Sequence, residues 1–349
     1  MTKVTNKQIY YKEIPKGFPQ LDTTFEYKQE EIDLNKVELS QGQVLLENLI
    51  ASVDPYMRGR MRDPKVRSYV PAFKLNAKLD TLTLSKVIRS NDSNLPEGSY
   101  VTLSAPCENY SVVKGKHCTP IITDPSIPLS YYLSILGVPG LTAYVGLYKI
   151  GQPKAGETIF ISGASGAVGQ IVGQLAKERG LRVIGSAGED EKVDYLIKEL
   201  KFDAAFNYKK EKDLKKILKE LCPKGIDIYF DNVGGKTLEV AIGLCNDFAR
   251  IPLCGMISQY NLAPKDYYPI KNLILAVPRR IKMEGFIATD DHGEYSKMFL
   301  KDCQNLIKQN KLKISESIDH GVENIPSSLL KLFKGGNQGK QLVKLSSKL

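Results

Sequence analysis

The sequence predicts an α/β protein with a doubly wound parallel sheet and a second, β-rich domain. Three observations predict this fold. From about residue 158, short apolar runs alternate with helical patterns; a glycine-rich turn joins the first run to the first helix; and the chain before about residue 125 has strand-like runs without such helices. Strands separated by helices of this length imply right-handed crossovers and a parallel sheet covered on both faces.

Five apolar runs form the predicted parallel sheet, namely residues 158–162, 182–185, 204–207, 226–231 and 250–254. The predicted helices between them cover residues 167–179, a stretch through 193–200, a lysine-rich stretch over 209–219, and 236–245. Earlier runs at 44–50, 85–89 and 100–103 are separated by Pro, Gly and Asn/Asp clusters, which is typical of an antiparallel sheet. The last section has a predicted helix over 295–308 and strand-like runs at 315–320 and 341–345.

Composition excludes several classes of protein. The 349-residue chain has a net charge of +10, but its lysines are spread out, and the densest group has the helical spacing of a solvated face, so no nucleic-acid partner is expected. Six scattered cysteines without a Cys-x-x-Cys pair, and only three histidines, predict reduced thiols and no metal site. Prolines and glycines interrupt the uncharged stretch 125–148, which predicts a buried segment at a domain junction rather than a membrane span.

The two ends of the chain bear on location. Residues 1–20 mix charges and prolines without the apolar core of a secretory signal, so an intracellular protein is expected. The chain ends Ser347-Lys348-Leu349, the tripeptide that the peroxisomal import receptor reads at a free C-terminus. In a eukaryotic source this favours the peroxisomal matrix over the cytosol; otherwise the protein is expected to be cytoplasmic.

The glycine-rich turn is the strongest functional signal. It reads Gly163-Ala164-Ser165-Gly166-Ala167-Val168-Gly169, after a predicted strand and before a predicted helix. Backbone N–H groups of such a loop can approach a pyrophosphate, whose negative charge lies at the positive end of the helix. On spacing alone a glycine-rich packing turn is an equal alternative, but the flanking strand and helix favour a dinucleotide site.

The residues after the second strand give a mixed signal about the cofactor. An acidic side chain here binds the ribose 2′-hydroxyl of NADH, whereas a basic one accepts the 2′-phosphate of NADPH. Glu189 lies at about the expected distance for the acid, yet small residues leave room for a phosphate that Lys192 can reach. By themselves these residues favour NADPH only slightly.

Several segments, in order, resemble one family. They are residues 53–61, 137–144, 164–169, 185–188 with Lys192, 206–209, 228–235, 254–261, 283–286 and 337–341. Together they cover about residues 50–345 and are similar to the zinc-independent branch of the medium-chain dehydrogenases/reductases that contains prostaglandin reductases and plant double-bond reductases. This resemblance implies a GroES-like β domain over 1–128, a Rossmann NADPH-binding domain over 129–295, and a section 296–349 that returns to the β domain. It also implies a homodimer.

The resemblance also assigns site residues. It implies that a glycine-loop group cradles the pyrophosphate, that Lys192 and Tyr208 hold the 2′-phosphate end, and that Asn232 and Asn337 bind elsewhere on NADPH. The loop group is Gly166, Ala167, Val168 and Gly169, and the residues expected on the nicotinamide side are Cys254, Gly255, Ser258, Tyr260 and Phe286.

The expected reaction is reduction of the carbon-carbon double bond of an α,β-unsaturated aldehyde or ketone, without a metal. Tyr260 is the expected hydrogen-bond donor to the carbonyl oxygen, with packing on the cofactor as its alternative role. Tyr56 is a second catalytic candidate, with a turn tyrosine packed in the β domain as an equal alternative. A quinone reductase, an enoyl-coenzyme A reductase and a non-enzymatic NADPH-binding module with an RNA or protein partner remain open.

Two departures from the family concern the first domain. Residues 81–87 stand where the family usually has a glycine-rich stretch, and residues 105–110 lack the usual tryptophan. Both changes lie in the expected substrate domain, so they affect the substrate preference rather than cofactor binding.

Overall fold

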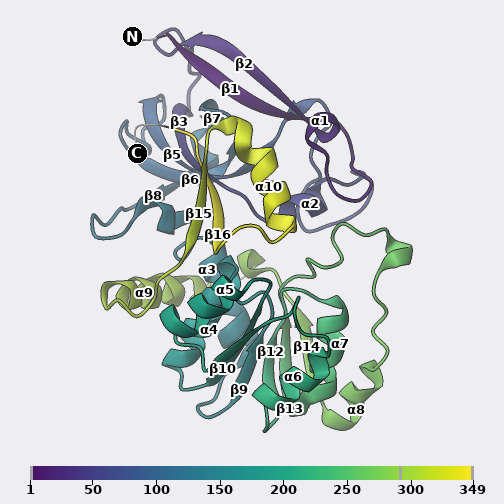
Figure 1. Ribbon diagram of the computed structural model, residues 1–349. Coiled ribbons are helices and arrows are strands. Elements are labelled where there is room, and N and C mark those ends of the chain that lie inside the picture. Colours follow the sequence, from purple (N-terminus) through teal and green to yellow (C-terminus); the bar gives the residue numbers. More distant parts are fainter. Residues whose placement is uncertain (1–2, 291–292, 347–349) are drawn as a thin grey trace. The chain divides into compact units, whose positions relative to one another are not determined.

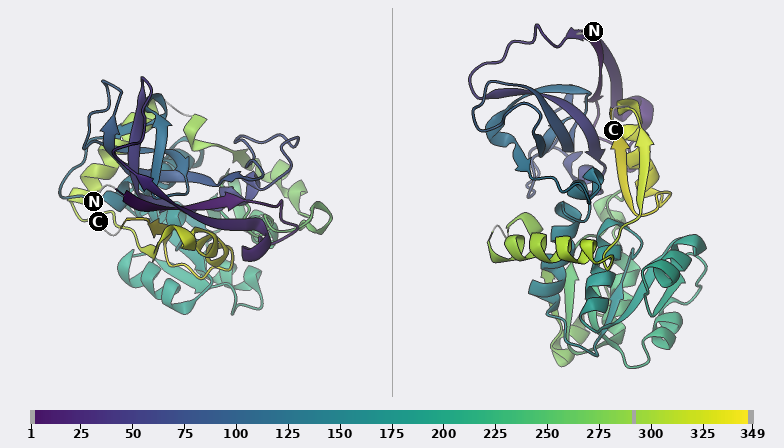
Figure 2. Two further views of the ribbon diagram at one scale, coloured as in Figure 1. Left: turned by 90° about the horizontal axis from the view of Figure 1, so that it is seen from above. Right: turned by 90° about the vertical axis from the view of Figure 1, so that its left-hand side faces the viewer.

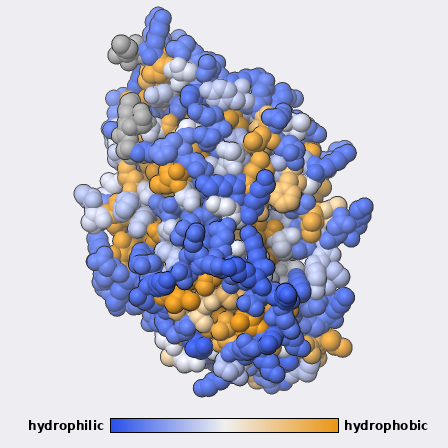
Figure 3. Space-filling model, viewed as in Figure 1, coloured by the Kyte–Doolittle hydropathy of each residue, from blue (hydrophilic) through white to orange (hydrophobic). Residues whose placement is uncertain are grey.

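The computed structural model describes residues 3–290 and 293–346, and the chain divides into two compact units. The first unit contains Met1–Leu133, Glu316–Asn337 and Gln341–Leu349, and the second contains Ser134–Ser315 and Gln338–Lys340. Hydrophilic side chains cover most of the face seen in Figure 3, as expected of a chain in which a quarter of the residues are charged. Among the helices of the described ranges, none combines the length and the apolar character needed to cross a membrane.

The first unit is built on two sheets. The larger has the strand order β15-β16-β3-β5-β6-β8 with β7 paired to β3, and the smaller has the order β2-β1-β4 (Figure 1). The strands are β1 (Lys3–Tyr11), β2 (Phe25–Asp33), β3 (Gln43–Ser52), β4 (Ala77–Lys78), β5 (Asp80–Ser90), β6 (Tyr100–Pro106), β7 (Tyr110–Lys114), β8 (Thr119–Ile121), β15 (Glu316–His320) and β16 (Lys340–Lys344). The pairs β3–β5 and β5–β6 are antiparallel and contain the runs predicted at 44–50, 85–89 and 100–103.

Both ends of the chain contribute to the core of the first unit. β1 and β2 pair along their whole length, side by side in Figure 2. Val322 and Val343, from the last section of the chain, pack with Ile9 of β1 and Met57 in one buried cluster. The short helices of the unit are α1 (Leu21–Thr24), α2 (Tyr56–Arg60), α10 (Ile325–Phe333) and the 3-10 turns η1 (Gly115–His117), η2 (Leu129–Leu133) and η8 (Val322–Asn324).

The second unit contains the predicted parallel sheet. Its order is β11-β10-β9-β12-β13-β14, and every adjacent pair is parallel. The strands are β9 (Thr158–Ile161), β10 (Arg182–Ala187), β11 (Ala204–Asn207), β12 (Ile226–Phe230), β13 (Cys245–Leu253) and β14 (Lys282–Gly285). The chain runs outward from β9 to β11 and then returns to β12 beside β9. The carboxyl ends of β9 and β12 therefore form a topological switch point, where ligands bind in folds of this class.

Helices connect the strands and cover both faces of the sheet (Figure 1). They are α3 (Val138–Val145), the π-helical η3 (Gly146–Gly151) and η4 (Tyr195–Glu199), α4 (Ala167–Glu178), α5 (Asp190–Asp194), α6 (Leu214–Leu221), α7 (Gly235–Leu244), α8 (Ala276–Arg279), α9 (Glu294–Lys308) and the 3-10 turns η5 (Pro264–Asp266), η6 (Leu273–Leu275) and η7 (Ala288–Asp290). The lysine-rich helix begins later than the predicted residue 209, because the Asp213 carboxylate caps α6 by accepting a hydrogen bond from the Lys216 N–H at 3.0 Å.

The units divide the chain at a different place from the predicted boundary at residue 296, because α9 packs within the second unit. The Tyr144 hydroxyl on α3 donates a hydrogen bond of 2.6 Å to the Asp302 carboxylate on α9. The rings of Tyr144 and Phe299 lie 5.9 Å apart in an edge-on arrangement. The return to the first unit therefore begins with β15, after Ser315, and not with α9.

Candidate cofactor site

The glycine-rich loop connects β9 to α4 at the switch point. Gly163 has a φ of +58°, and the Gly166 N–H donates to its carbonyl oxygen at 3.0 Å, which folds the loop back on itself. A Cβ atom on Gly169 would lie 2.6 Å from the Gly163 oxygen and 2.7 Å from the Ala164 Cα, so only glycine lets α4 pack this closely on the loop. The first turn of α4, including Ala167 and Val168, presents N–H groups that have no acceptor inside the helix. An anion such as a pyrophosphate suits this position.

A segment from the far end of the chain completes the loop. Gly339 forms a parallel β-bridge with Gly166, and the neighbouring Lys340 N–H donates to the Ser315 oxygen at 2.9 Å. Gly339 has a φ of +72°, and a Cβ there would lie 1.8 Å from the Ser315 oxygen. The Gln170 side chain on α4 accepts from the Ser315 N–H at 2.9 Å. The start of α4 is thus held from both sides.

The turn after β12 is organised by one buried carboxylate. Asp231 is fully buried, and its Oδ1 accepts hydrogen bonds from the Tyr229 hydroxyl at 2.6 Å, the Val233 N–H at 2.9 Å and the Gly234 N–H at 2.8 Å. Its Oδ2 is buried without a hydrogen-bond partner in the described part of the chain. Burial raises the pKa of Asp231, and the hydrogen bonds to Oδ1 offset part of that effect. Asn232 follows, with its side-chain amide donating to the Ser162 oxygen at 2.8 Å.

A second loop, residues 254–260, packs on this turn. The N–H groups of Cys254 and Gly255 both donate to the backbone carbonyl oxygen of Asp231, at 2.9 and 3.0 Å. The Ser258 hydroxyl donates to the Val233 oxygen at 2.6 Å. Burial raises the pKa of the Cys254 thiol to about 12, so the thiol stays protonated at neutral pH.

Tyr260 lies at the end of this second loop. Its hydroxyl accepts a hydrogen bond from the Met256 N–H at 3.0 Å. A Cβ on Gly255 would lie 3.0 Å from the same hydroxyl oxygen, so the glycine leaves room for the phenol. A phenol hydroxyl can both accept and donate a hydrogen bond, and an accepted bond strengthens it as a donor.

Phe286 follows β14 and packs against the sheet. Its ring lies 6.4 Å from that of Phe230 and nearly perpendicular to it. A Cβ on Gly146 would lie 2.7 Å from the Phe286 ring and 2.6 Å from that of Phe230. Phe286 is half-buried, so part of its surface faces away from the core.

The end of β10 gathers basic side chains. Lys192 is only 7% exposed and forms an ion pair of 3.1 Å with Glu189, which is 43% exposed. A Cβ on Gly188 would lie 3.0 Å from the Lys209 Cε and 3.1 Å from the Tyr208 hydroxyl oxygen, so both side chains lie over this glycine. The Lys209 ammonium has no ion-pair partner among residues 3–290 and 293–346. This end of the strand can accept a doubly charged phosphate.

Comparison with known proteins agrees with this arrangement. Residues 7–121 match the family described as the N-terminal domain of oxidoreductase, and residues 167–304 match that described as zinc-binding dehydrogenase. The chain is 44% identical to the NADP-dependent oxidoreductase RED1 of Cochliobolus heterostrophus, over 98% of each chain. It is also 44% identical to the NADP(+)-dependent 2-alkenal reductase of Nicotiana tabacum, over 99% of this chain and 98% of the relative.

A solved structure with NADPH bound is also similar to this chain. CurA from Vibrio vulnificus in complex with NADPH is 37% identical, with a TM-score of 0.89 over 98% of this chain and 99% of that one. The chain belongs to the zinc-independent medium-chain dehydrogenases/reductases. The predicted fold class, a GroES-like β domain plus a Rossmann doubly wound parallel sheet, is confirmed.

Within this medium-chain reductase, the described residues contain no cluster of three His, Cys, Asp or Glu side chains that could hold a metal ion. The second unit brings most of the predicted cofactor residues to the carboxyl ends of its strands. They are Gly166, Ala167, Val168, Gly169, Lys192, Tyr208, Asn232, Cys254, Gly255, Ser258 and Tyr260, with Phe286 just after β14. Glycines leave space at the pyrophosphate loop and at residue 188, and the lysines supply positive charge, so these residues fit a dinucleotide that carries a 2′-phosphate.

Two predicted residues belong to the first unit. Asn337 is its last residue before the chain enters the second unit at Gln338, two positions before Gly339. Tyr56 begins α2 and packs against the buried cluster that contains Met57. Burial is the main cause that raises the pKa of Tyr56, so its phenol is a neutral group at physiological pH. The structure therefore does not bring Tyr56 and Tyr260 together within one unit.

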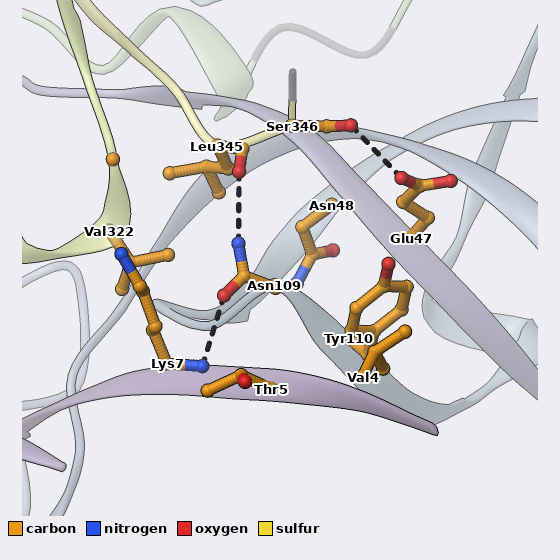
Figure 4. Close-up of a pocket in the computed structure, with 11 residues that line it drawn as sticks. Val4, Thr5, Lys7, Glu47, Asn48, Asn109, Tyr110, Val322, Leu345 and Ser346 are labelled. Carbon is orange, nitrogen blue, oxygen red and sulfur yellow. Dashed lines mark hydrogen bonds between the residues drawn. The ribbon is translucent and has the colours of Figure 1, made fainter. Parts of the chain in front are cut away.

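The first unit also contains a cavity of about 200 Å³, which holds none of the predicted site residues (Figure 4). Its polar walls largely bond to each other: the Asn109 side chain accepts from the Lys7 N–H at 3.0 Å and donates to the Leu345 oxygen at 2.9 Å. The Ser346 hydroxyl donates to the Glu47 carboxylate at 2.9 Å. These contacts hold Leu345 and Ser346, which follow β16, to the rest of the unit. Ser347, Lys348 and Leu349 lie outside the described residues.

Three residues that shape the site have no role assigned to them from the sequence, namely Asp231, Lys209 and Gly339. Each lies in a segment that resembles the family; otherwise Asp231 is the end of a predicted strand and Lys209 part of a predicted solvated helix face. Asp231 could have been suspected, because a carboxylate that follows an apolar strand directly is costly to bury without donors. No local signal marks Gly339, because its partner Gly166 is remote in sequence.

Proposed function

We propose that the protein reduces the carbon-carbon double bond of α,β-unsaturated aldehydes and ketones with NADPH. The observation that carries the proposal is the position of the Tyr260 hydroxyl. It accepts a hydrogen bond from the Met256 N–H and lies next to Gly255, which has no side chain to cover it. This places a polarised phenol on the loop that packs against the turn of Asn232. The similarity to the 2-alkenal reductase named above supports this reaction, and the similarity to the NADP-dependent oxidoreductase supports the cofactor.

The cofactor is NADPH. The first turn of α4 would hold the pyrophosphate, and Lys192 and Tyr208 would hold the 2′-phosphate, with Lys209 beside them. When bound, NADPH would supply a hydride to the electron-poor β carbon of the substrate, and a proton from water would complete the saturated product at the α carbon. The carbonyl oxygen of the substrate then carries developing negative charge.

The protein's own residues serve positioning and charge stabilisation. Tyr260 donates a hydrogen bond from its hydroxyl to the substrate carbonyl oxygen, where the charge develops. Asp231 holds the turn 231–235 and the loop 254–260 together through its side chain and its backbone oxygen. This contact keeps the phenol in place before substrate arrives.

The reaction can be tested by following NADPH absorbance with the purified full chain. The panel contains a medium-chain 2-enal, an enone, an enoyl-coenzyme A and a quinone, with NADH in parallel. We expect rapid turnover of the enal or enone with NADPH, and recovery of the saturated carbonyl compound. Turnover of the quinone alone, or of the enoyl-coenzyme A alone, would move the protein to another reductase class. NADPH binding without any turnover would favour a non-enzymatic role.

Tyr260→Phe tests the proposed catalytic residue. Loss of the donor should lower kcat about 100-fold while the NADPH dissociation constant stays within about twofold, because the variant keeps the ring and loses only the hydroxyl. Tyr56→Phe, in the first unit, is the matched control for the second tyrosine candidate. If Tyr260→Phe turns over as fast as the parent, Tyr260 only packs on the cofactor.

We also propose a homodimer and import into peroxisomes. Family similarity supports the first, and Ser347-Lys348-Leu349 supports the second. Light scattering of the purified chain tests the dimer. A fluorescent protein fused to the N-terminus tests import: the full chain should become punctate in cells with peroxisomes, and a variant without Leu349 should stay diffuse.

A further inference from the structure

The ion pair between Glu189 and Lys192 lies where the cofactor's 2′ group is recognised. Glu189 follows Gly188 at the end of β10, and its carboxylate lies 3.1 Å from the Lys192 ammonium. Lys192 is the cation that the family assigns to the 2′-phosphate. In this chain the phosphate-binding lysine therefore already has an anionic partner.

The two members of the pair differ in exposure. The Lys192 side chain is 7% exposed, whereas that of Glu189 is 43% exposed. Lys192 is thus held by its surroundings, while Glu189 can rotate into solvent at small cost. An incoming phosphate can therefore replace the Glu189 carboxylate as the partner of Lys192. Lys192 itself stays in place, because its side chain is buried.

The adjacent acid, Asp190, is engaged elsewhere. Its carboxylate forms an ion pair with Lys210 and accepts a hydrogen bond of 2.8 Å from the Asn207 amide. The hydrogen bonds from Lys210 and then from Asn207 lower the pKa of Asp190. Of Glu189 and Asp190, only Glu189 therefore pairs with Lys192 in the described part of the chain.

We propose that Glu189 is a specificity-determining residue that competes with the 2′-phosphate for Lys192. It weakens the preference for NADPH and lets the site accept NADH as a second cofactor. With NADPH, the phosphate takes the place of Glu189, which moves into solvent. With NADH, Glu189 keeps its bond to Lys192 and offers a carboxylate oxygen to the ribose 2′-hydroxyl. This inference rests on the proposed function, because it assumes that the adenosine ribose lies at this end of β10.

The test measures the binding of cofactor fragments with and without the 2′-phosphate, so it needs no substrate turnover. Dissociation constants of 2′,5′-ADP and 5′-AMP are measured by calorimetry at fixed ionic strength for the parent, Glu189→Gln, Asp190→Asn and Lys192→Gln. The binding of NADPH and NADH is measured by fluorescence on the same proteins. Thermal unfolding of each variant confirms that the fold is intact.

We expect Glu189→Gln to bind 2′,5′-ADP about five- to tenfold more tightly than the parent, because the phosphate no longer displaces or repels a carboxylate. Affinity for 5′-AMP and NADH should fall or stay equal, so the NADPH-to-NADH affinity ratio rises. Asp190→Asn is the matched control: it removes the same charge one residue away and should change the ratio less than twofold. Lys192→Gln should weaken 2′,5′-ADP at least tenfold.

Two results would overturn the competition. One is that the parent and Glu189→Gln bind 2′,5′-ADP with equal affinity, although Lys192→Gln binds it more weakly. The other is an equal gain in Asp190→Asn, since that would be a general effect of net charge. A parent protein that binds 2′,5′-ADP and reduces no enal or enone contradicts the proposed function alone, so the two failures are distinguishable.

Discussion

Replacing Gly169 with alanine should disturb both the stability of the second unit and its affinity for NADPH. The added Cβ would lie 2.6 Å from the Gly163 oxygen, 2.7 Å from the Ala164 Cα and 2.9 Å from the Ala164 oxygen. All three are backbone atoms of the loop, so no side chain can rotate away. Ordinary contact begins at 3.4 Å, and the loop and α4 must separate by about 0.8 Å to relieve the closest contact.

The energetic cost follows from this overlap. Forcing one extra carbon into a well-packed site costs about 1–3 kcal/mol. For a unit of this size, each kcal/mol lowers the melting temperature by about 2–4 °C, so Gly169→Ala should lower it by roughly 2–12 °C. The displaced loop also carries the N–H groups at the start of α4. We therefore expect NADPH affinity to fall at least tenfold.

Differential scanning fluorimetry and NADPH titration measure the two effects. Gly285→Ala is the control, because Gly285 lies in the same unit, on the edge strand β14, with nothing within 4 Å of the added carbon and no left-handed φ. Its melting temperature should stay within about 1 °C of the parent. A Gly169→Ala protein with the parent's melting temperature and NADPH affinity would refute the close-approach argument.

Three further predictions concern other sites. Tyr11→Phe should leave the urea midpoint unchanged or raise it, because the variant removes a buried hydroxyl without a partner in the described chain; a clear fall would contradict this. Because burial raises the pKa of Asp231 in the folded protein, its contribution makes stability fall as pH rises above the unfolded value of about 4. Asp231→Asn should therefore flatten the decline of the urea midpoint above that pH, and an unaltered slope would exclude Asp231 as its source. Gly188→Ala should weaken 2′,5′-ADP severalfold at an unchanged melting temperature, because the added carbon meets only the ends of Lys209 and Tyr208; equal affinity would count against a phosphate site there.

The sequence predicted the second unit well because its signals are local. The run at 204–207 has the same bounds as β11, and the predicted helix over 167–179 differs from α4 by one residue. An apolar strand of four to six residues followed by an amphipathic helix is recognisable without knowledge of its neighbours. Helix ends were less accurate, since the start of α6 depends on the Asp213 cap rather than on the spacing of lysines.

Contacts between distant segments could not be predicted. α9 joins the second unit through contacts between residues that are remote in sequence, such as the hydrogen bond between Tyr144 and Asp302. Glu189 and Lys192 were identified as competing signals for NADH and NADPH, but only the structure shows that they bind each other. A sequence shows which charged side chains are present, but it does not show which of them form ion pairs with each other.

The bridge between Gly166 and Gly339 has a consequence for the modularity of the protein. The nucleotide-binding unit is not one continuous piece of chain, because a strip of three residues, Gln338–Lys340, is supplied by the segment that leads into β16. A fragment cut at Ser315 would expose the start of α4 that this strip covers. Exchanging the cofactor unit between relatives therefore requires two grafts, and an insertion or deletion near the C-terminus would be felt at the phosphate loop.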